Sequence, residues 1–165
     1  MSHDRRKRPA AAGLGMLIVT GLLGASCTKP VDVKAIQVTD VTTGWFDAGV
    51  VDGKNKLVPS VTFRLRNTSD QPLDSVSLNI AFRFVDTGDN HEEIFKQRVP
   101  FEGKQTELIT VRSQNGYTAD PPQTRVEMLK HSGFRDMDVV IFVREVAAEW
   151  VQLHRVRVDR QLLTQ

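Results

Sequence analysis

The sequence predicts a mainly β protein, built as an antiparallel β-sandwich with one short helix. Apolar and polar residues alternate over 61–66 and again over 75–84, as they do in strands that bury one face. A dense cluster of turn-forming residues at 67–72 separates these two stretches. Many short strands, abundant turns and a single short helix are typical of two packed sheets.

Further strands are expected where apolar residues recur between polar connections. They are predicted at 33–45, 94–99, 107–112, 138–143 and 150–158. In the last stretch the apolar phase changes between Leu153 and Val156, and one extra residue in a strand reverses the face of all that follow. We therefore predict a bulge near His154 and Arg155.

One short helix is predicted between the strands at 107–112 and 138–143. Asp120 is expected to cap it, either of the two prolines that follow fits its first turn, and Gly133 is expected to end it. Val126 and Leu129 would share its apolar face. Such a helix would lie across an open end or one face of the sheets.

The stretch 58–88 resembles a known family of domains. It contains the end of one predicted strand, a turn, and a second, longer strand with alternating apolar and polar residues. It is similar to immunoglobulin-like domains of bacterial envelope proteins, including the FxLYD type. The residues that carry the resemblance are Leu65-Arg66-Asn67, Pro72-Leu73 and Phe84-Val85-Asp86-Thr87-Gly88. The resemblance implies an immunoglobulin-like sandwich that serves as an interaction or spacer module, although a fold alone does not fix a function.

The first 27 residues have the three parts of an export signal. A basic head at 5–8 precedes an apolar core at 14–23 and three small residues before Cys27, the only cysteine. The run Leu23-Gly24-Ala25-Ser26-Cys27 resembles a bacterial lipobox. This resemblance implies a diacylglycerol on the Cys27 sulfur, cleavage before it and acylation of the new amino terminus. The predicted divisions are a signal peptide at 1–26, a lipidated cysteine and short tether at 27–32, and a sandwich domain at 33–165.

Two other interpretations of the first segment stay open. Cleavage after Ser26 without lipid would leave a lone thiol in an oxidising compartment. The second interpretation is an uncleaved membrane anchor, because the stretch from Pro9 to Thr28 contains no charge and has about the 20 residues that a membrane-spanning helix needs. Every interpretation exports the domain, and in both anchored ones the basic flank stays inside. Because Thr28 rather than an aspartate follows Cys27, the outer membrane facing the periplasm is the default location in a bacterium with two membranes.

Most of the excess positive charge belongs to the export signal. The whole chain has 22 Lys and Arg against 20 Asp and Glu. Four of these cations lie at 5–8, so the chain after Cys27 is close to neutral. A near-neutral domain lacks the basic surface that nucleic acids bind, and we expect no nucleic-acid partner.

Arginines on predicted strands are the main candidates for a binding surface. If those strands share one sheet, their outer side would pair with carboxylates or lipid phosphates. The alternative is that arginine stems cover apolar sheet surface while acidic neighbours neutralise them. Tyr117, expected in a loop, is a further candidate contact, whereas Trp45 and Trp150 are expected in the core. The arginines are Arg64, Arg66, Arg83, Arg155 and Arg157.

Acidic and histidine residues are expected to have structural roles. The acids at 86–93 crowd a predicted hairpin tip without the spacing of a calcium loop. The histidines at 91, 131 and 154 are far apart in sequence and lack a zinc motif. We therefore expect no metal and no cofactor.

The expected function is a non-catalytic binding, accessory or assembly module of the cell envelope. Its partners would be the membrane, through the lipid on Cys27, and another envelope protein. No nucleophile motif occurs, and no enzyme activity is expected. Two alternatives are a passive structural spacer and an envelope enzyme that acts on glycan or peptide through loop carboxylates, such as Glu92-Glu93 or Asp136 with Asp138.

Overall fold

The computed structural model describes residues 32–145 and 148–163 of the chain. The predicted signal-peptidase region at 23–26 and the predicted lipidation site Cys27 lie outside these residues. Within the two described ranges, no helix has the length and apolar character needed to cross a membrane.

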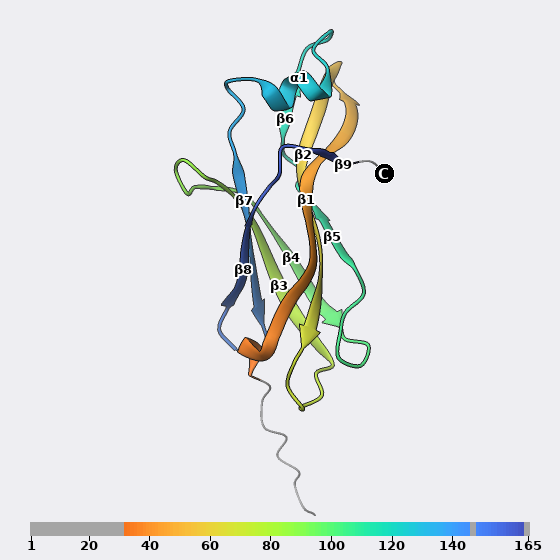
Figure 1. Cartoon of the computed structure of the whole chain (residues 1–165), viewed down its shortest axis with the longest axis vertical. Coiled ribbons are helices and arrows are strands. Elements are labelled where there is room, and N and C mark those ends of the chain that lie inside the picture. Colours follow the sequence, from red (N-terminus) through yellow and green to blue (C-terminus); the bar gives the residue numbers. More distant parts are fainter. Residues whose placement is uncertain (1–31, 146–147, 164–165) are drawn as a thin grey trace, which may run out of the picture.

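Two sheets pack face to face as a β-sandwich, which confirms the predicted fold class (Figure 1). Sheet A has the order β5-β2-β1-β9, with β6 also paired to β2, and sheet B has the order β4-β3-β7-β8. Every pairing is antiparallel except that of β1 with the short β9. Sheet A comprises β1 (Ile36–Val51), β2 (Lys54–Asn67), β5 (Ile109–Arg112), β6 (Tyr117–Ala119) and β9 (Leu162–Leu163). Sheet B comprises β3 (Ser75–Phe84), β4 (Asn90–Pro100), β7 (Met137–Arg144) and β8 (Val151–Arg157).

The core lies between the sheets and follows the predicted alternation. Trp45 on β1 is fully buried, as expected. Burial of one such large side chain contributes about 1.5–3 kcal/mol. The inward residues of β2, β3 and β7 are buried in the same way: Leu57, Val61, Phe63, Leu65, Val76, Leu78, Ile80, Phe82, Met137, Val139, Ile141 and Val143.

The predicted bulge is present in β8. Ile141 pairs with His154 and Phe142 pairs with Gln152, so Leu153 is the extra residue. Because of this residue, Val151 and Val156 both pair with inward positions of β7.

Strand β4 begins earlier than predicted. The predicted strand at 94–99 extends back to Asn90, so Glu92 and Glu93 lie in a strand and not at the hairpin tip. The tip is confined to 85–89. The pattern is weak here because β4 is an edge strand with exposed and half-buried residues only.

The helix, α1 (Arg125–Lys130), begins later and ends earlier than predicted. Thr124, not Asp120, is its N-cap, and Thr124 and Glu127 form a capping box through reciprocal hydrogen bonds. With this start, Met128 and Leu129 face the core while Val126 is 48% exposed. The expected shared face of Val126 and Leu129 is therefore wrong, as is the expected end at Gly133.

The two ends of the sandwich differ. The first described residues form a short 3-10 helix, η1 (Val33–Ala35), at one end, and α1 covers the other (Figure 1). Between these ends the chain crosses from β8 to β9, where the buried Thr43 hydroxyl donates to the carbonyl of Arg157 and accepts from the amide of Asp159. This crossing closes one side of the sandwich.

Candidate functional site

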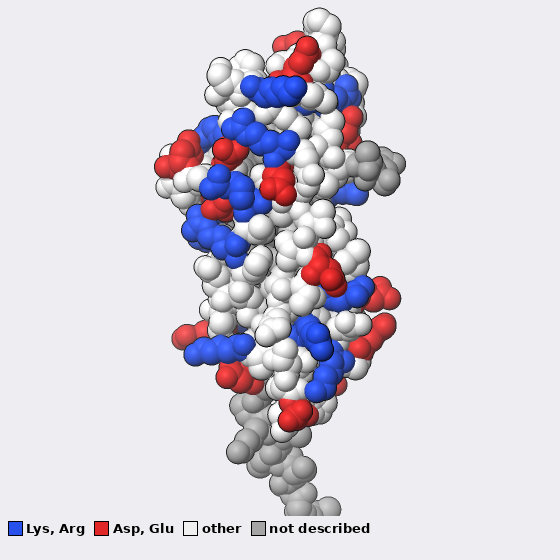
Figure 2. Space-filling view, viewed as in Figure 1, with Lys and Arg blue, Asp and Glu red and all other residues white. Residues whose placement is uncertain are grey.

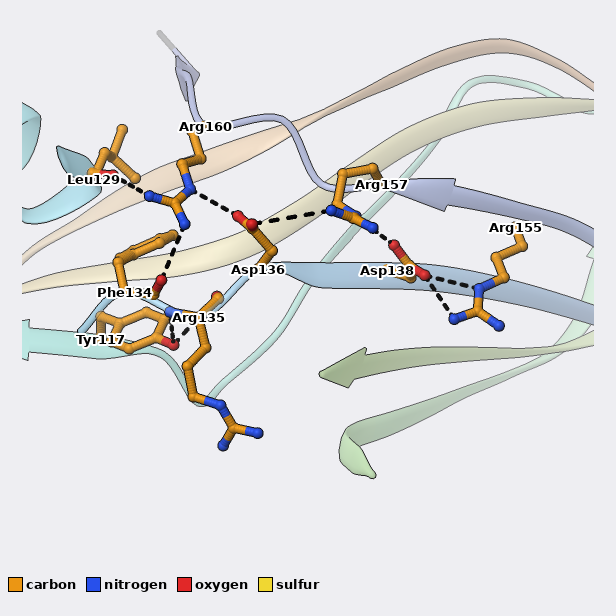
Figure 3. Close-up of polar contacts among 9 residues, drawn as sticks. All are labelled: Tyr117, Leu129, Phe134, Arg135, Asp136, Asp138, Arg155, Arg157 and Arg160. Atoms are coloured by element: carbon orange, nitrogen blue, oxygen red, sulfur yellow. Dashed lines mark hydrogen bonds and ion pairs between the residues drawn. The ribbon is translucent and has the colours of Figure 1, made fainter. Parts of the chain in front are cut away.

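Arginine and aspartate side chains alternate along the outer face of sheet B (Figure 3). The two Asp138 oxygens accept hydrogen bonds from Arg157 Nε at 2.7 Å and Arg155 Nε at 2.8 Å. Asp136 accepts from Arg160 Nε at 2.7 Å and lies 3.9 Å from Arg157 Nη1. We call these five residues the arginine ladder. It arises because Asp138 on β7 is the direct partner of Arg157 on β8.

Asp138 is the buried member of the arginine ladder, with 6% of the residue exposed. Burial raises the pKa of its carboxyl, but hydrogen bonds and charge from Arg157 and Arg155 outweigh burial, and the pKa lies below its usual value. Both arginine side chains remain about half exposed, at 51% and 50%. Since a guanidinium carries five donors, each arginine keeps N–H groups for a further acceptor.

An aromatic cluster continues the same outer face. Phe95 on β4 is 58% exposed, and its ring centroid lies 6.0 Å from that of Trp150. The Arg144 guanidinium carbon lies 4.5 Å from the centre of the Trp150 ring. The guanidinium of Arg83 lies 5.6 Å from the ring of Phe142. These contacts span sheet B, because Phe142 on β7 and Phe95 on β4 flank the same residue of β3.

Trp150 is therefore not a core residue, which corrects the sequence-based expectation. It precedes β8, is half-buried, and lies against Phe95 and Arg144 outside the sandwich. The large apolar ring is covered by other aromatic and arginine side chains of the outer face.

The arginine–aromatic face is the name we use for seven residues together: Arg83, Phe95, Phe142, Arg144, Trp150, Arg155 and Arg157. Two carboxylates lie among them, Asp138 and Glu93, and a third, Asp136, lies 3.9 Å from Arg157. Within the described ranges, Arg83 and Arg144 form no ion pair, so positive charge is in excess on this face. Figure 2 shows blue and red side chains side by side over the upper part of the molecule, on the side of β7 and β8.

The five predicted arginines do not form one surface. Arg83, Arg155 and Arg157 lie on sheet B, whereas Arg64 and Arg66 lie on β2 of sheet A. The alternative that acidic neighbours neutralise arginines holds for the two on β8 and for Arg64, which lies 3.7 Å from Asp40. Alternation along one strand shows which residues face outward, but it does not show which sheet the strand joins.

Tyr117 is also not the loop contact that was predicted. It belongs to β6, is half-buried, and its ring stacks on Phe134 with a centroid distance of 4.3 Å. Its hydroxyl accepts from the amide of Arg135 at 2.7 Å and donates to the carbonyl of Arg135 at 3.2 Å (Figure 3). The side chain is committed to packing the end of the sandwich beneath α1.

Glu92 forms a second carboxylate site, on the side of the sandwich where β4 and β5 meet. One oxygen accepts from the Ser113 hydroxyl, from the amides of Gln114 and Asn115 at 2.9 and 3.1 Å, and from Asn115 Nδ2 at 3.2 Å. We call this the Glu92 clasp, because it joins sheet B to the loop after β5 of sheet A. Partial burial raises the pKa of Glu92, but the hydrogen bonds outweigh it and the pKa lies below its usual value.

Two hollows in the described part of the molecule are lined by residues outside the arginine–aromatic face. A groove of about 780 Å³ is lined by 96–100 of β4 and by 106–110, and a pocket of about 350 Å³ lies beneath α1. In the part of the chain that the structure describes, no group of three or more His, Cys, Asp or Glu side chains is placed to hold a metal ion.

The sequence reasoning missed Phe95, Phe142 and Arg144. A signal was available for the first, because Phe95 follows the inward residue Ile94 and so must face outward in a strand. An aromatic residue in the polar phase of an edge strand is a candidate contact residue.

No family model matches the chain, and no curated protein matches it. Among solved structures, one described as "X-ray structure of Northeast Structural Genomics Consortium target SoR45" is similar at 15% sequence identity. The similarity covers 77% of this chain and 89% of that one, with a TM-score of 0.38. At this level it carries no argument about function.

Proposed function

We propose that the chain is an exported lipoprotein, anchored through Cys27, that acts as a non-catalytic binding or assembly module of the cell envelope. Its working surface is the arginine–aromatic face of sheet B. In a bacterium with two membranes, the anchor places the domain at the outer membrane, facing the periplasm.

The observation that carries the proposal is the composition of this face. Phe95 is 58% exposed and contacts Trp150, with arginines stacked beside the aromatic rings. Aromatic residues and arginine are enriched at protein interfaces, where they dominate the binding energy.

The state of the carboxylates favours binding over catalysis. Asp138 and Asp136 hold the arginine ladder, and Glu92 holds two parts of the fold together. A general acid needs a carboxyl whose pKa lies near the working pH. The lowered pKa values of Asp138 and Glu92 move these two groups away from that role.

The position of the first described residues agrees with an anchored module. Asp32 caps η1 at the end of the sandwich opposite α1. Cys27 precedes Asp32 by only five residues in the sequence. A lipid on Cys27 would hold the sandwich by this end and leave the outer face of sheet B open to the side.

The anchor is tested by metabolic labelling with an alkyne analogue of palmitate in a bacterial host. We expect the wild-type chain and the control Ser26→Ala to incorporate the label, and Cys27→Ala to lose it, because only Cys27 offers a thiol. Equal labelling of wild type and Cys27→Ala would remove the lipoprotein interpretation.

The binding role is tested by photocrosslinking in intact cells. A photoreactive phenylalanine replaces Gln152, an exposed outward residue of β8, or the control Thr42, an exposed residue of β1 on sheet A. We expect one reproducible protein partner from position 152 and none from position 42. If neither position captures a protein, the spacer alternative is favoured and the binding role is wrong.

A further inference from the structure

We infer that the partner of the arginine–aromatic face is an acidic protein surface, whose Asp and Glu side chains meet the arginines while an apolar group packs against Phe95 and Trp150. The inference rests on the proposed binding function and adds the chemistry of the partner. Four observations support it: charge, arginine geometry, shape and orientation.

The charges of the face are unbalanced. With the rest of the arginine ladder counted, five arginines lie among three carboxylates: Arg83, Arg144, Arg155, Arg157 and Arg160 against Asp136, Asp138 and Glu93. All three carboxylates are already engaged. Asp138 accepts from two arginines, and Glu93 accepts from Asn79 and Asn90. Asp136 accepts from Arg160 and lies 3.9 Å from Arg157. Potentials at protein interfaces are complementary, so the matching surface supplies negative charge.

Stacking of an arginine on an aromatic ring holds its guanidinium in a position from which it can bind a carboxylate. Arg144 lies over Trp150, and a guanidinium stacked on a ring keeps the N–H donors of its edge free. Those donors form a planar fork that fits a carboxylate with two parallel hydrogen bonds. Because the ring already fixes the side chain, less conformational entropy is lost on binding.

The shape of the face favours a protein over a small ligand. Sites for small molecules are concave, and the groove of about 780 Å³ and the pocket of about 350 Å³ both lie elsewhere. Phe95 instead stands on an edge strand with 58% of its surface exposed. An exposed aromatic residue on a face that also carries arginines is typical of a protein interface.

The orientation of the face argues against the bilayer as its partner. The strands of sheet B run along the long axis of the molecule, and η1 lies at one end of that axis (Figure 1). An anchor at this end directs the outer face of sheet B sideways. Anionic lipid is therefore the less favoured partner. The crosslinking experiment below also shows whether the face binds an anionic glycan.

The experiment uses the full chain in cells, with the photoreactive residue at position 152. Arg144→Glu and Arg83→Glu are compared with Arg66→Glu, the control reversal on sheet A. We expect each sheet B reversal to reduce capture of the protein partner about tenfold or more, as for an interface arginine. The control is expected to leave capture unchanged. Export and resistance to added protease show that each variant is folded.

A charge exchange completes the test. We expect an Asp→Arg or Glu→Arg substitution at the crosslinked site of the captured protein to restore capture by Arg144→Glu. Capture that is insensitive to both sheet B reversals, or lowered equally by Arg66→Glu, overturns the acidic-surface inference while the binding function stands. Capture of glycan or lipid in place of protein overturns it too. If position 152 captures nothing, the proposed use of this face is itself wrong.

Discussion

Asp138 and Glu92 are two carboxylates on neighbouring parts of sheet B, and their surroundings differ in kind. Asp138 is held by two charged donors, Arg155 and Arg157, on the adjacent strand. Glu92 is held by four neutral donors of the loop at 113–115, which belongs to the other sheet. Both have a lowered pKa, although burial alone would raise it.

Glu92 holds the two sheets together, whereas Asp138 holds two arginines in position on the surface. Neutral N–H and O–H groups satisfy Glu92 without placing any charge on the surface, and they join the two sheets at the side where β4 and β5 meet. Arginines satisfy Asp138 and leave two half-exposed cations in fixed positions. We therefore expect Glu92 to matter mainly for stability and Asp138 mainly for binding.

The largest effect is expected from Glu92→Ala, which removes the carboxylate that four donors share. Hydrogen bonds to a charged group contribute about 1.5–3 kcal/mol, and we expect the free energy of unfolding to fall by about 2–3 kcal/mol, measured by urea unfolding. Glu93→Ala is the matched control, because Glu93 is exposed and accepts hydrogen bonds from the side chains of Asn79 and Asn90. Equal losses in the two variants would contradict the Glu92 clasp.

A smaller loss of stability is expected from Asp138→Ala. The carboxylate is buried, but Arg155 and Arg157 are half exposed and can be hydrated, so we expect a loss of about 1–2 kcal/mol. Asp70→Ala is the control, since Asp70 forms an exposed ion pair with Lys104 and should lose at most about 0.5 kcal/mol. Capture at position 152 should fall for Asp138→Ala only. Unchanged capture would show that the arginine ladder does not position the binding surface.

The pH dependence distinguishes the carboxylates further. A lowered pKa stabilises the fold above the pKa of the unfolded chain, and this stabilisation is lost as the pH falls. For Glu92 the loss begins near its usual value of 4.5, and for Asp138 near 3.8. In urea unfolding at successively lower pH, the difference between wild type and Glu92→Gln should shrink first. The opposite order of Glu92→Gln and Asp138→Asn would contradict the assignment.

Strands in which apolar and polar residues alternate regularly were predictable from the sequence. Features that depend on which strands pair with each other were not. Strand β3 has the predicted bounds because its apolar residues alternate without interruption from Ser75 to Phe84. The Glu92 clasp was missed because its donors come from residues about 20 positions away in the sequence, across two sheets. The true start of α1 carried a signal that was overlooked: Thr124 and Glu127 have the spacing of a capping box.

The same limit applies to the binding surface. Five arginines were predicted to face outward, but the pairing of strands placed Arg64 and Arg66 on sheet A. Trp150 was assigned to the core because large aromatic rings are buried more often than not. Only the structure shows that Phe95 and Arg144 cover part of it on the outside.

The smallest expected effect is the response to salt, and it tests the difference between charged and neutral donors directly. Raising NaCl from about 0.05 to about 1 M shortens the screening length to about 3 Å. The half-exposed ion pairs of Asp138 should lose about 0.5 kcal/mol, whereas the neutral hydrogen bonds of Glu92 should change little. The measurement is the stability difference between wild type and Asp138→Asn at each salt concentration, with Glu92→Gln as the control. Both variants keep the size of the side chain and remove its charge. A salt response shared by both would mean that general surface charge, not the arginine ladder, causes the effect.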